Sequence, residues 1–314
     1  MPAEIIMVEG RIGRVKPVRT AIVCGSDAWL WIDAGIAGTP RDAILPALAT
    51  RGLTPPARNI AVITHGDVDH FGGITELREA VPQLVTMAHA LDARLMEDLD
   101  VLVAERYDRF RDEGVVLDDD RVAQLRSRAG EAVAVDVRLT GAARIDLGDG
   151  EHWRVLPAPG HSGGHVVVVS DARRHAFLGD AVMGWGVIDG EGCLLPPHYI
   201  DVLAYRSTVD LLRTLDLETM DAAHEARLTG ASVDAFLAAS AEAVDAIGTA
   251  VSAADAVIES DAPDRLARVC ADVHARLGRW PDASPLTLAD AVSAHLAQLR
   301  VGSNTHPYAD GGVA

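Results

Sequence analysis

The pattern of apolar and polar positions predicts alternating strands and helices over most of the chain. Residues 18–33 contain two apolar runs on either side of a Gly-Ser-Asp turn, which predicts a β-hairpin. Residues 60–64 form a short apolar run typical of a buried strand, and residues 74–81 continue with helical spacing. Further strands are expected at residues 153–159, 165–170 and 175–180. This alternation predicts a layered α/β core within the first 230 residues.

Helices are expected at three other places. Thr39, followed by Pro40 and Asp42, is typical of a capped helix start, and Gly52 is typical of a helix end. Residues 89–130 are rich in Leu, Arg, Glu and Asp with helical spacing, so we expect an inserted helical pair there.

From about residue 232 the chain is Ala-rich and helical, with breaks near Pro263 and Pro281. These helices would form an extension over residues 231–314. With the insert, they are candidates for covering a pocket or for forming a homodimer.

Composition and charge narrow the classes of function. The 314 residues are 49% hydrophobic, enough for a sizeable core, and the net charge of -18 disfavours binding to nucleic acid. The three cysteines, Cys24, Cys193 and Cys270, are too widely spaced to suggest a disulfide framework. No signal peptide is visible at the N-terminus, and no apolar run approaches the roughly 20 residues of a membrane span. We therefore expect a cytoplasmic protein with no membrane partner.

The segment His65-Gly66-Asp67-Val68-Asp69-His70 places four imidazole or carboxylate side chains directly after the predicted strand. Zinc, iron and manganese accept such ligands. On an extended segment alternate residues face the same way, so His65, Asp67 and Asp69 can converge, whereas Asp69 and His70 diverge unless the chain turns. The alternative is a solvated acidic loop that caps a helix.

Three later residues carry less information when each is taken alone. His161 lies in the glycine-rich segment PGHSGGH, Asp180 ends the strand-like run HAFLGD, and His224 is isolated. Taken alone, His161 could be a turn histidine, Asp180 a turn residue or helix cap, and His224 a histidine of no special role.

Taken in order, HxDxDH, PGHS, GD and a late histidine closely resemble the metallo-β-lactamase superfamily, whose usual motif is HxHxDH. The opening hairpin and the segment GDAVMGWG add to this resemblance, which covers roughly residues 18–230. It implies a four-layer αβ/βα sandwich, in which residues 1–230 form the catalytic domain, with two metal ions at one edge. The first metal would be held by His65, Asp67 and His161, and the second by Asp69, His70 and His224, with Asp180 as the bridge.

Asp67 is the departure from the family motif, which has histidine there. If it is a ligand, the metal site is less positive and harder than usual, which shifts preference from zinc towards manganese or iron. Zinc remains the first expectation for the two divalent ions. The alternative is that Asp67 is not a ligand and that one metal is weakly bound.

By this resemblance the protein would be a dinuclear hydrolase of a small molecule. A metal-bridging hydroxide would cleave an ester, lactone or thioester bond, Asp69 would orient the nucleophile or carry its proton, and Asp180 would bridge the metals. His165 would orient a ligand or be structural. The substrate pocket is expected to be lined by Met183, Trp185, His198, Tyr199 and Tyr205.

Several other functions are compatible with some of these residues. Asp67 favours an iron-dependent redox enzyme on the same fold, of dioxygenase or diiron type. The lack of a flavodoxin-like second domain in the chain argues against it. β-Lactam hydrolysis is disfavoured, because several true β-lactamase classes have cysteine where this chain has Asp180 and are typically exported. Phosphodiester cleavage of nucleic acid and metal binding without catalysis are the remaining alternatives.

Overall fold

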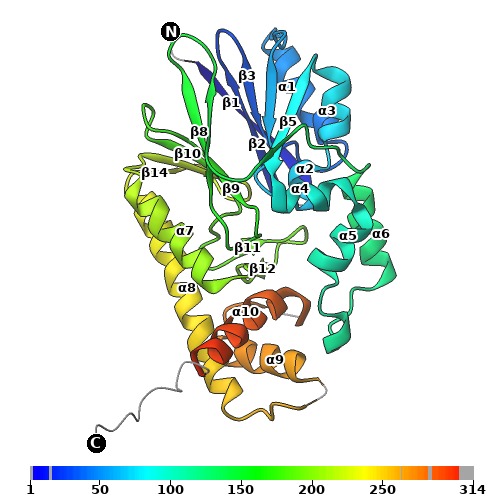
Figure 1. Cartoon of the computed structure of the whole chain (residues 1–314), viewed down its shortest axis with the longest axis vertical. Coiled ribbons are helices and arrows are strands. Elements are labelled where there is room, and N and C mark those ends of the chain that lie inside the picture. Colours follow the sequence, from blue (N-terminus) through cyan, green and yellow to red (C-terminus); the bar gives the residue numbers. More distant parts are fainter. Residues whose placement is uncertain (1–2, 14–15, 263, 282–284, 304–314) are drawn as a thin grey trace, which may run out of the picture.

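Two six-stranded sheets form the centre of the computed structural model (Figure 1). The model describes residues 3–13, 16–262, 264–281 and 285–303. In the first sheet the strand order follows the chain, with an antiparallel β1-β2-β3 part and a parallel β3-β4-β5-β6 part. Its strands are β1 (Glu4–Ile12), β2 (Lys16–Cys24), β3 (Trp29–Ile32), β4 (Asn59–Val62), β5 (Leu84–His89) and β6 (Val137–Leu139). The predicted hairpin is confirmed as β2 and β3, whereas β1 was not predicted.

The second sheet has the order β14-β13-β10-β9-β8-β7, and only β10 and β13 in it are parallel neighbours. Its strands are β7 (Ala143–Asp146), β8 (His152–Pro157), β9 (Val166–Ser170), β10 (His175–Gly179), β13 (Thr219–Ala222) and β14 (Leu228–Thr229). A small hairpin of β11 (Val187–Ile188) and β12 (Leu194–Leu195) lies between the sheets and the C-terminal helices (Figure 1).

Helices cover the outer face of each sheet. The first sheet is covered by η1 (Pro40–Ile44), α1 (Leu45–Thr50), α2 (Val68–Phe71), α3 (Ile74–Ala80) and α4 (Ala90–Glu97). The chain continues beyond the edge of this sheet as α5 (Leu99–Leu102), η2 (Val103–Tyr107), η3 (Arg111–Glu113) and α6 (Asp119–Ala129) (Figure 1). The second sheet is covered by α7 (Val202–Thr214) and α8 (Ala231–Asp255), which lead to α9 (Arg265–Leu277) and α10 (Pro285–Ser303).

Three apolar clusters hold these layers together. Leu30, Trp153 and Phe177 are buried between the two sheets, and Phe71 and Leu77 are buried between the first sheet and its helices. The third cluster joins the second sheet to its helices. The order helix, sheet, sheet, helix confirms the predicted four-layer αβ/βα sandwich.

Two local predictions were wrong in detail. Thr39 itself has helical backbone angles and makes no side-chain cap bond, because the helical conformation already includes it. The insert is not a helical pair: it forms three α-helices, α4, α5 and α6, with the short segments η2 and η3 between α5 and α6. Several short acidic and glycine-containing stretches interrupt the helical spacing there.

The C-terminal helices share their core with the second sheet. Buried residues of α8, α9 and α10 form one continuous apolar cluster with strands β9, β10 and β13. Within the described residues, α8 is the one helix long and apolar enough to cross a membrane by length and composition. Its buried side chains Val233, Leu237, Val244 and Val251 belong to this cluster, so packing in the core accounts for its apolar face.

Trp280 tests how firmly the extension is attached. Its side chain is 2% exposed, and its indole N–H donates a hydrogen bond to the carbonyl oxygen of Trp185 at 3.0 Å. Trp280→Ala should lower the free energy of unfolding in urea by about 3–5 kcal/mol, because it leaves a large cavity. Leu203→Ala, at a position 62% exposed, should change it by less than about 0.5 kcal/mol. Equal effects of the two substitutions would show that Trp280 is not a core residue.

Candidate metal centre

The HGDVDH segment lies at the carboxyl end of β4. The backbone is still extended at Asp67 (φ -81°, ψ 145°), and the next four residues form helix α2. This entry into a helix is the turn that adjacent ligands require. It separates Asp69 and His70 from His65, so the two halves of the motif can serve two different metal ions.

The other candidate ligands come from the second sheet. His161 lies in the loop between β8 and β9, Asp180 follows β10, and His224 follows β13. Two glycines allow these loops to approach so closely. A Cβ on Gly160 (φ +137°) would lie 2.6 Å from the backbone nitrogen of Tyr205, and a Cβ on Gly179 (φ +53°) would lie 2.4 Å from the hydroxyl of Thr64.

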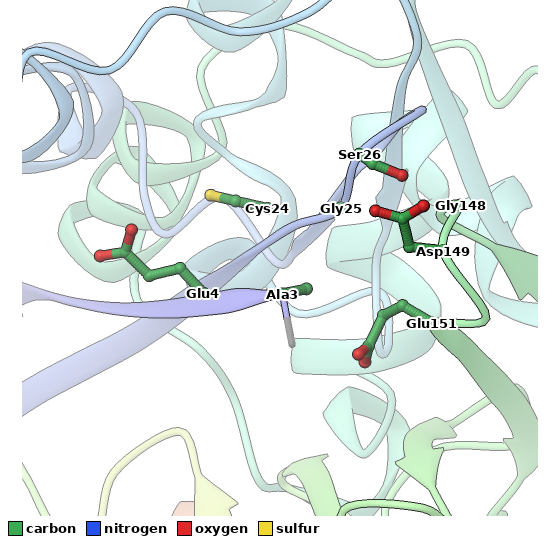
Figure 2. A pocket seen from close by; sticks show the side chains of 8 residues that line it. All are labelled: Ala3, Glu4, Cys24, Gly25, Ser26, Gly148, Asp149 and Glu151. Carbon is green, nitrogen blue, oxygen red and sulfur yellow. The ribbon is translucent and has the colours of Figure 1, made fainter. Parts of the chain in front are cut away.

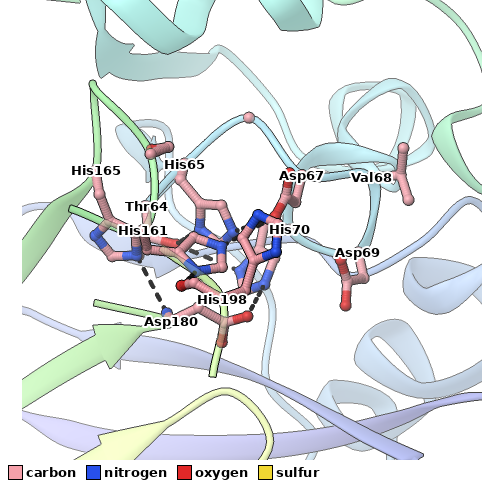
Figure 3. A network of polar contacts seen from close by, with 12 residues as sticks. Thr64, His65, Asp67, Val68, Asp69, His70, His161, His165, Asp180 and His198 are labelled. Atoms are coloured by element: carbon pink, nitrogen blue, oxygen red, sulfur yellow. Dashed lines mark hydrogen bonds and ion pairs between the residues drawn. The ribbon is translucent and has the colours of Figure 1, made fainter. Parts of the chain in front are cut away.

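The structure brings the predicted residues together in two groups (Figure 3). In each group the potential ligand atoms lie within 4.8 Å of one another. One group consists of His65, His161 and Asp180, and the other of Asp69, His70 and His224. Asp67 lies beside the first group, because its Oδ2 is 3.2 Å from His65 Nε2 and 3.0 Å from His161 Nε2.

Each of the four histidines is fixed through its Nδ1 atom. A carbonyl or carboxylate oxygen beside that atom accepts a hydrogen bond from Nδ1–H, so the neutral imidazole has its lone pair on Nε2. The Nδ1 partners are Thr64 Oγ1 for His65 (3.1 Å), Asp33 Oδ2 for His70 (2.8 Å), the His198 carbonyl for His161 (2.9 Å) and the Pro17 carbonyl for His224 (2.7 Å). The Thr64 hydroxyl donates to Asp33 Oδ2 at 2.9 Å, so it is free to accept from His65.

The Nε2 lone pairs point at carboxylates. His224 Nε2 lies 3.3 Å from Asp180 Oδ2 and 3.4 Å from Asp69 Oδ2, and His70 Nε2 lies 3.7 Å from Asp180 Oδ2. The Nε2 atoms of His70 and His224 are buried and have no hydrogen-bond partner. Buried acceptors that face acceptors need positive charge between them, supplied by a proton on the imidazole or by a metal ion. The donor set of imidazoles and carboxylates therefore fits two divalent metal ions.

The pKa values of His70 and Asp180 also indicate that positive charge is favoured here. Burial lowers the pKa of His70, but the carboxylates of Asp33 and Asp180 outweigh it and hold that pKa well above its ordinary value. For Asp180, burial raises the pKa, but His224 and His70 outweigh it and hold it well below the ordinary value. Positive charge is thus strongly favoured between these side chains.

Arg106 of η2 is a site residue that the sequence did not reveal. Its guanidinium, 6% exposed, donates two hydrogen bonds of 2.6 Å to Asp67, from Nε to Oδ1 and from Nη2 to Oδ2. Burial raises the pKa of Asp67, but Arg106 outweighs it and holds that pKa well below its ordinary value. The expectation that Asp67 makes the centre less positive omitted this charge. Arg106 cancels the charge of Asp67, so the electrostatic argument for manganese or iron loses its basis.

Asp92 of α4 joins the two loops that carry His65 and His161. Its carboxylate accepts hydrogen bonds from the backbone nitrogens of Gly66 (2.9 Å) and Gly164 (2.7 Å) and from the hydroxyl of Ser162 (2.6 Å). In sequence this residue is one of many acids in the insert, so nothing there marked it.

Two further residues hold a ligand in place. Lys16 at the start of β2 lies 3.2 Å from Asp69 Oδ2, and this lysine is the main cause that keeps the pKa of Asp69 well below its ordinary value despite burial. His165 lies outside both groups, and its Nε2 accepts a hydrogen bond from the backbone nitrogen of Asp180 at 3.1 Å. It therefore fixes the loop that carries Asp180.

A cavity of about 600 Å³ opens beside the two groups. Met183 and His198 lie in its wall, as expected, and Thr287 and Asp290 of α10 extend it. The other predicted pocket residues lie elsewhere. Tyr199 and Tyr205 are completely buried in the third apolar cluster, and Trp185 packs against that cluster with the guanidinium of Arg279 over its ring. Their apolar rings fit the core better than a solvated wall.

A second hollow, lined by Cys24, Gly148 and Glu151 among others, lies at the other end of β2 from Lys16 (Figure 2). It contains none of the histidines and carboxylates of the two groups.

The histidines and aspartates follow strands of both sheets and could hold two metal ions. This arrangement indicates a class of metalloprotein. A family model of the metallo-beta-lactamase superfamily matches residues 13–224. The chain belongs to this superfamily, whose members are mostly metal-dependent hydrolases.

Solved structures show the same fold. A metallo-beta-lactamase family protein from Thermus thermophilus has a TM-score of 0.72 at 18% identity, with 95% of this chain and 94% of that chain covered. A beta-lactamase domain protein from Burkholderia ambifaria has a TM-score of 0.68 at 18% identity, with coverages of 98% and 90%. An archaeal superfamily protein from Sulfolobus tokodaii has a TM-score of 0.55 at 20% identity, with 74% and 84% covered. The similarity to the Thermus and Burkholderia proteins covers 95% and 98% of this chain, so it extends into the C-terminal helices.

Asp92→Ala tests whether the two loops depend on one carboxylate. The substitution leaves buried backbone donors without an acceptor, so the free energy of unfolding should fall by roughly 3 kcal/mol. The affinity for metal should fall by about 10-fold to 100-fold, because contacts behind a ligand orient it. Both can be measured by urea unfolding and by competition with a chelator. Asp112→Ala, at an exposed position of the same insert, is the control, and an equal effect there would contradict the assignment.

Asp67→His would rebuild the usual motif, but we expect it to destabilise the protein. Arg106 would remain buried without its carboxylate, at a cost of about 3–5 kcal/mol in the free energy of unfolding. The double variant Asp67→His/Arg106→Gln should recover most of this loss, because both charges leave together. A stable single variant in urea unfolding would show that the two side chains are not energetically coupled.

Proposed function

We propose that this protein is a dinuclear metal-dependent hydrolase that cleaves an ester, lactone or thioester bond of a small molecule. The observation that carries the proposal is the set of Nε2 lone pairs, each fixed by a partner at Nδ1 and aimed at a carboxylate. Such an arrangement suits divalent metal ions, which imidazole nitrogens and carboxylate oxygens bind. In particular, His65 and His161 would hold one ion, and His70 and His224 the other.

When bound, two divalent ions would supply Lewis-acid activation of a carbonyl group and an acidified water. The protein's own residues orient the reaction. Asp180 belongs to the first group, and its Oδ2 faces His70 and His224 of the second. His165 fixes the backbone at that position. Asp69 is held ionised by Lys16, so its carboxylate can accept a hydrogen bond from an attacking water and then its proton.

The cavity supports a small substrate. Its volume suits a metabolite-sized molecule, and its wall combines apolar residues such as Leu117, Leu125 and Val187 with charged ones such as Lys16 and Arg106. The overall charge of -18 argues against a nucleic-acid substrate. Arg106 offsets the charge of Asp67, so the redox alternative rests on the hardness of that carboxylate as a ligand and not on the charge of the site.

Purified protein supplied with zinc or manganese should hydrolyse at least one activated ester, lactone or thioester without oxygen. A chelator should abolish turnover, and added zinc, manganese or iron should restore it. Asp180→Ala should reduce turnover at least about 100-fold while circular dichroism stays unchanged, since loss of a ligand should exceed the effect of outer contacts. Asp210→Ala, at an exposed position of α7, should keep full activity.

Two outcomes would contradict the proposal. Strict oxygen dependence with stoichiometric iron would indicate redox chemistry, and near-normal turnover of a well-folded Asp180→Ala variant would show that Asp180 is not part of the centre.

A further inference from the structure

The guanidinium of Arg106 interacts with two residues of the first metal group at once. Besides its two bonds to Asp67, its Nη2 lies 3.0 Å from His161 Nε2, and its Nη1 donates to the His161 carbonyl oxygen at 3.2 Å. Every nitrogen of this side chain is therefore engaged with Asp67 or His161. All hydrogen bonds of this buried guanidinium therefore go to residues of the candidate metal centre.

The bond to His161 occupies a ligand atom. Because His161 Nδ1 donates to the His198 carbonyl oxygen, Nε2 carries the lone pair, and Nη2 of Arg106 donates to that lone pair. The same Nη2 donates to Asp67 Oδ2, the carboxylate oxygen that faces His65 and His161. The arginine thus supplies positive charge to atoms that would otherwise bind a metal ion.

The second group is arranged differently. Its imidazole atoms His70 Nε2 and His224 Nε2 are buried without any hydrogen-bond donor in the described part of the chain. The lysine beside this group, Lys16, contacts the carboxylate of Asp69. Nothing in these contacts blocks the two imidazole lone pairs.

We propose that Arg106 is a resident cation of the first metal site, so that the second site binds metal first and more tightly. This inference rests on the proposed metal centre and adds the order in which its two sites fill. To bind an ion with His65 and His161, the first site must release Nη2, while Nε can stay bonded to Asp67 Oδ1. That release makes metal binding at the first site less favourable, whereas binding at the second site requires no such release.

The cavity offers the displaced guanidinium another carboxylate. Asp290 of α10 lies in the same wall as Arg106, and the two side chains attract each other electrostatically. Asp290 is buried, and its carboxylate oxygens already lie 2.7 Å from Arg109 Nε and 3.1 Å from His198 Nε2. The guanidinium would therefore move towards negative charge and not into an apolar wall.

The test is a metal titration of the metal-free protein with zinc, in competition with a chromophoric chelator, repeated with cobalt to follow its absorption bands. The unsubstituted protein should bind two ions in two phases, with dissociation constants at least about tenfold apart. Arg106→Gln should tighten the weaker site by at least about tenfold and leave the tighter site unchanged. Arg213→Gln, the same substitution at an exposed arginine of α7, should leave both sites unchanged.

Two ions bound with equal affinity by the unsubstituted protein would overturn the inference, as would an Arg106→Gln variant whose weaker site does not tighten. If Arg106→Gln fails to fold, Asp67→His/Arg106→Gln removes both charges, and its two sites should become nearly equal; a persistent weak site would overturn the inference. A protein that binds no metal would instead contradict the proposed function. Two-phase binding without turnover of any ester, lactone or thioester would contradict only the hydrolase activity.

Discussion

The structure depends on one electrostatic constraint: lone pairs of four imidazoles and the oxygens of buried carboxylates face one another between two sheets. Such a cluster is unfavourable unless positive charge lies within it. The fold supplies part of that charge itself, through Arg106 at one metal group and Lys16 at the other. It also fixes the histidines through their far nitrogens, so they cannot turn away. The remaining need is what divalent ions satisfy.

The sequence predicted the parts of the centre that are local. HGDVDH is a short segment after a strand, and the spacing of its ligands shows which side chains diverge at the turn into α2. His161, Asp180 and His224 could be assigned only because their order resembles a known family. The hairpin of β2 and β3 and a layered α/β core followed from apolar periodicity, which reports burial directly. The four-layer arrangement was implied by the family resemblance.

The residues that escaped prediction act across long separations in the chain. Arg106 meets Asp67 from the insert, Asp92 joins two loops, and Asp290 arrives from the C-terminal helix. In sequence each is one charged residue among many on a helix. Only packing decides which charged residue is buried, and packing of distant segments leaves no periodic trace. Tyr199 and Tyr205 show the converse, because proximity to Asp180 in sequence did not bring them to the cavity.

The position of α10 has a consequence for the nascent chain. Every candidate metal ligand lies before residue 225, whereas Asp290 and Thr287 complete the cavity wall from the last helix. Because synthesis proceeds from the N-terminus and domains fold as they emerge, the ligands leave the ribosome well before that wall does. The cavity wall is therefore completed only after every candidate ligand has been synthesised, when α10 packs onto the rest of the fold.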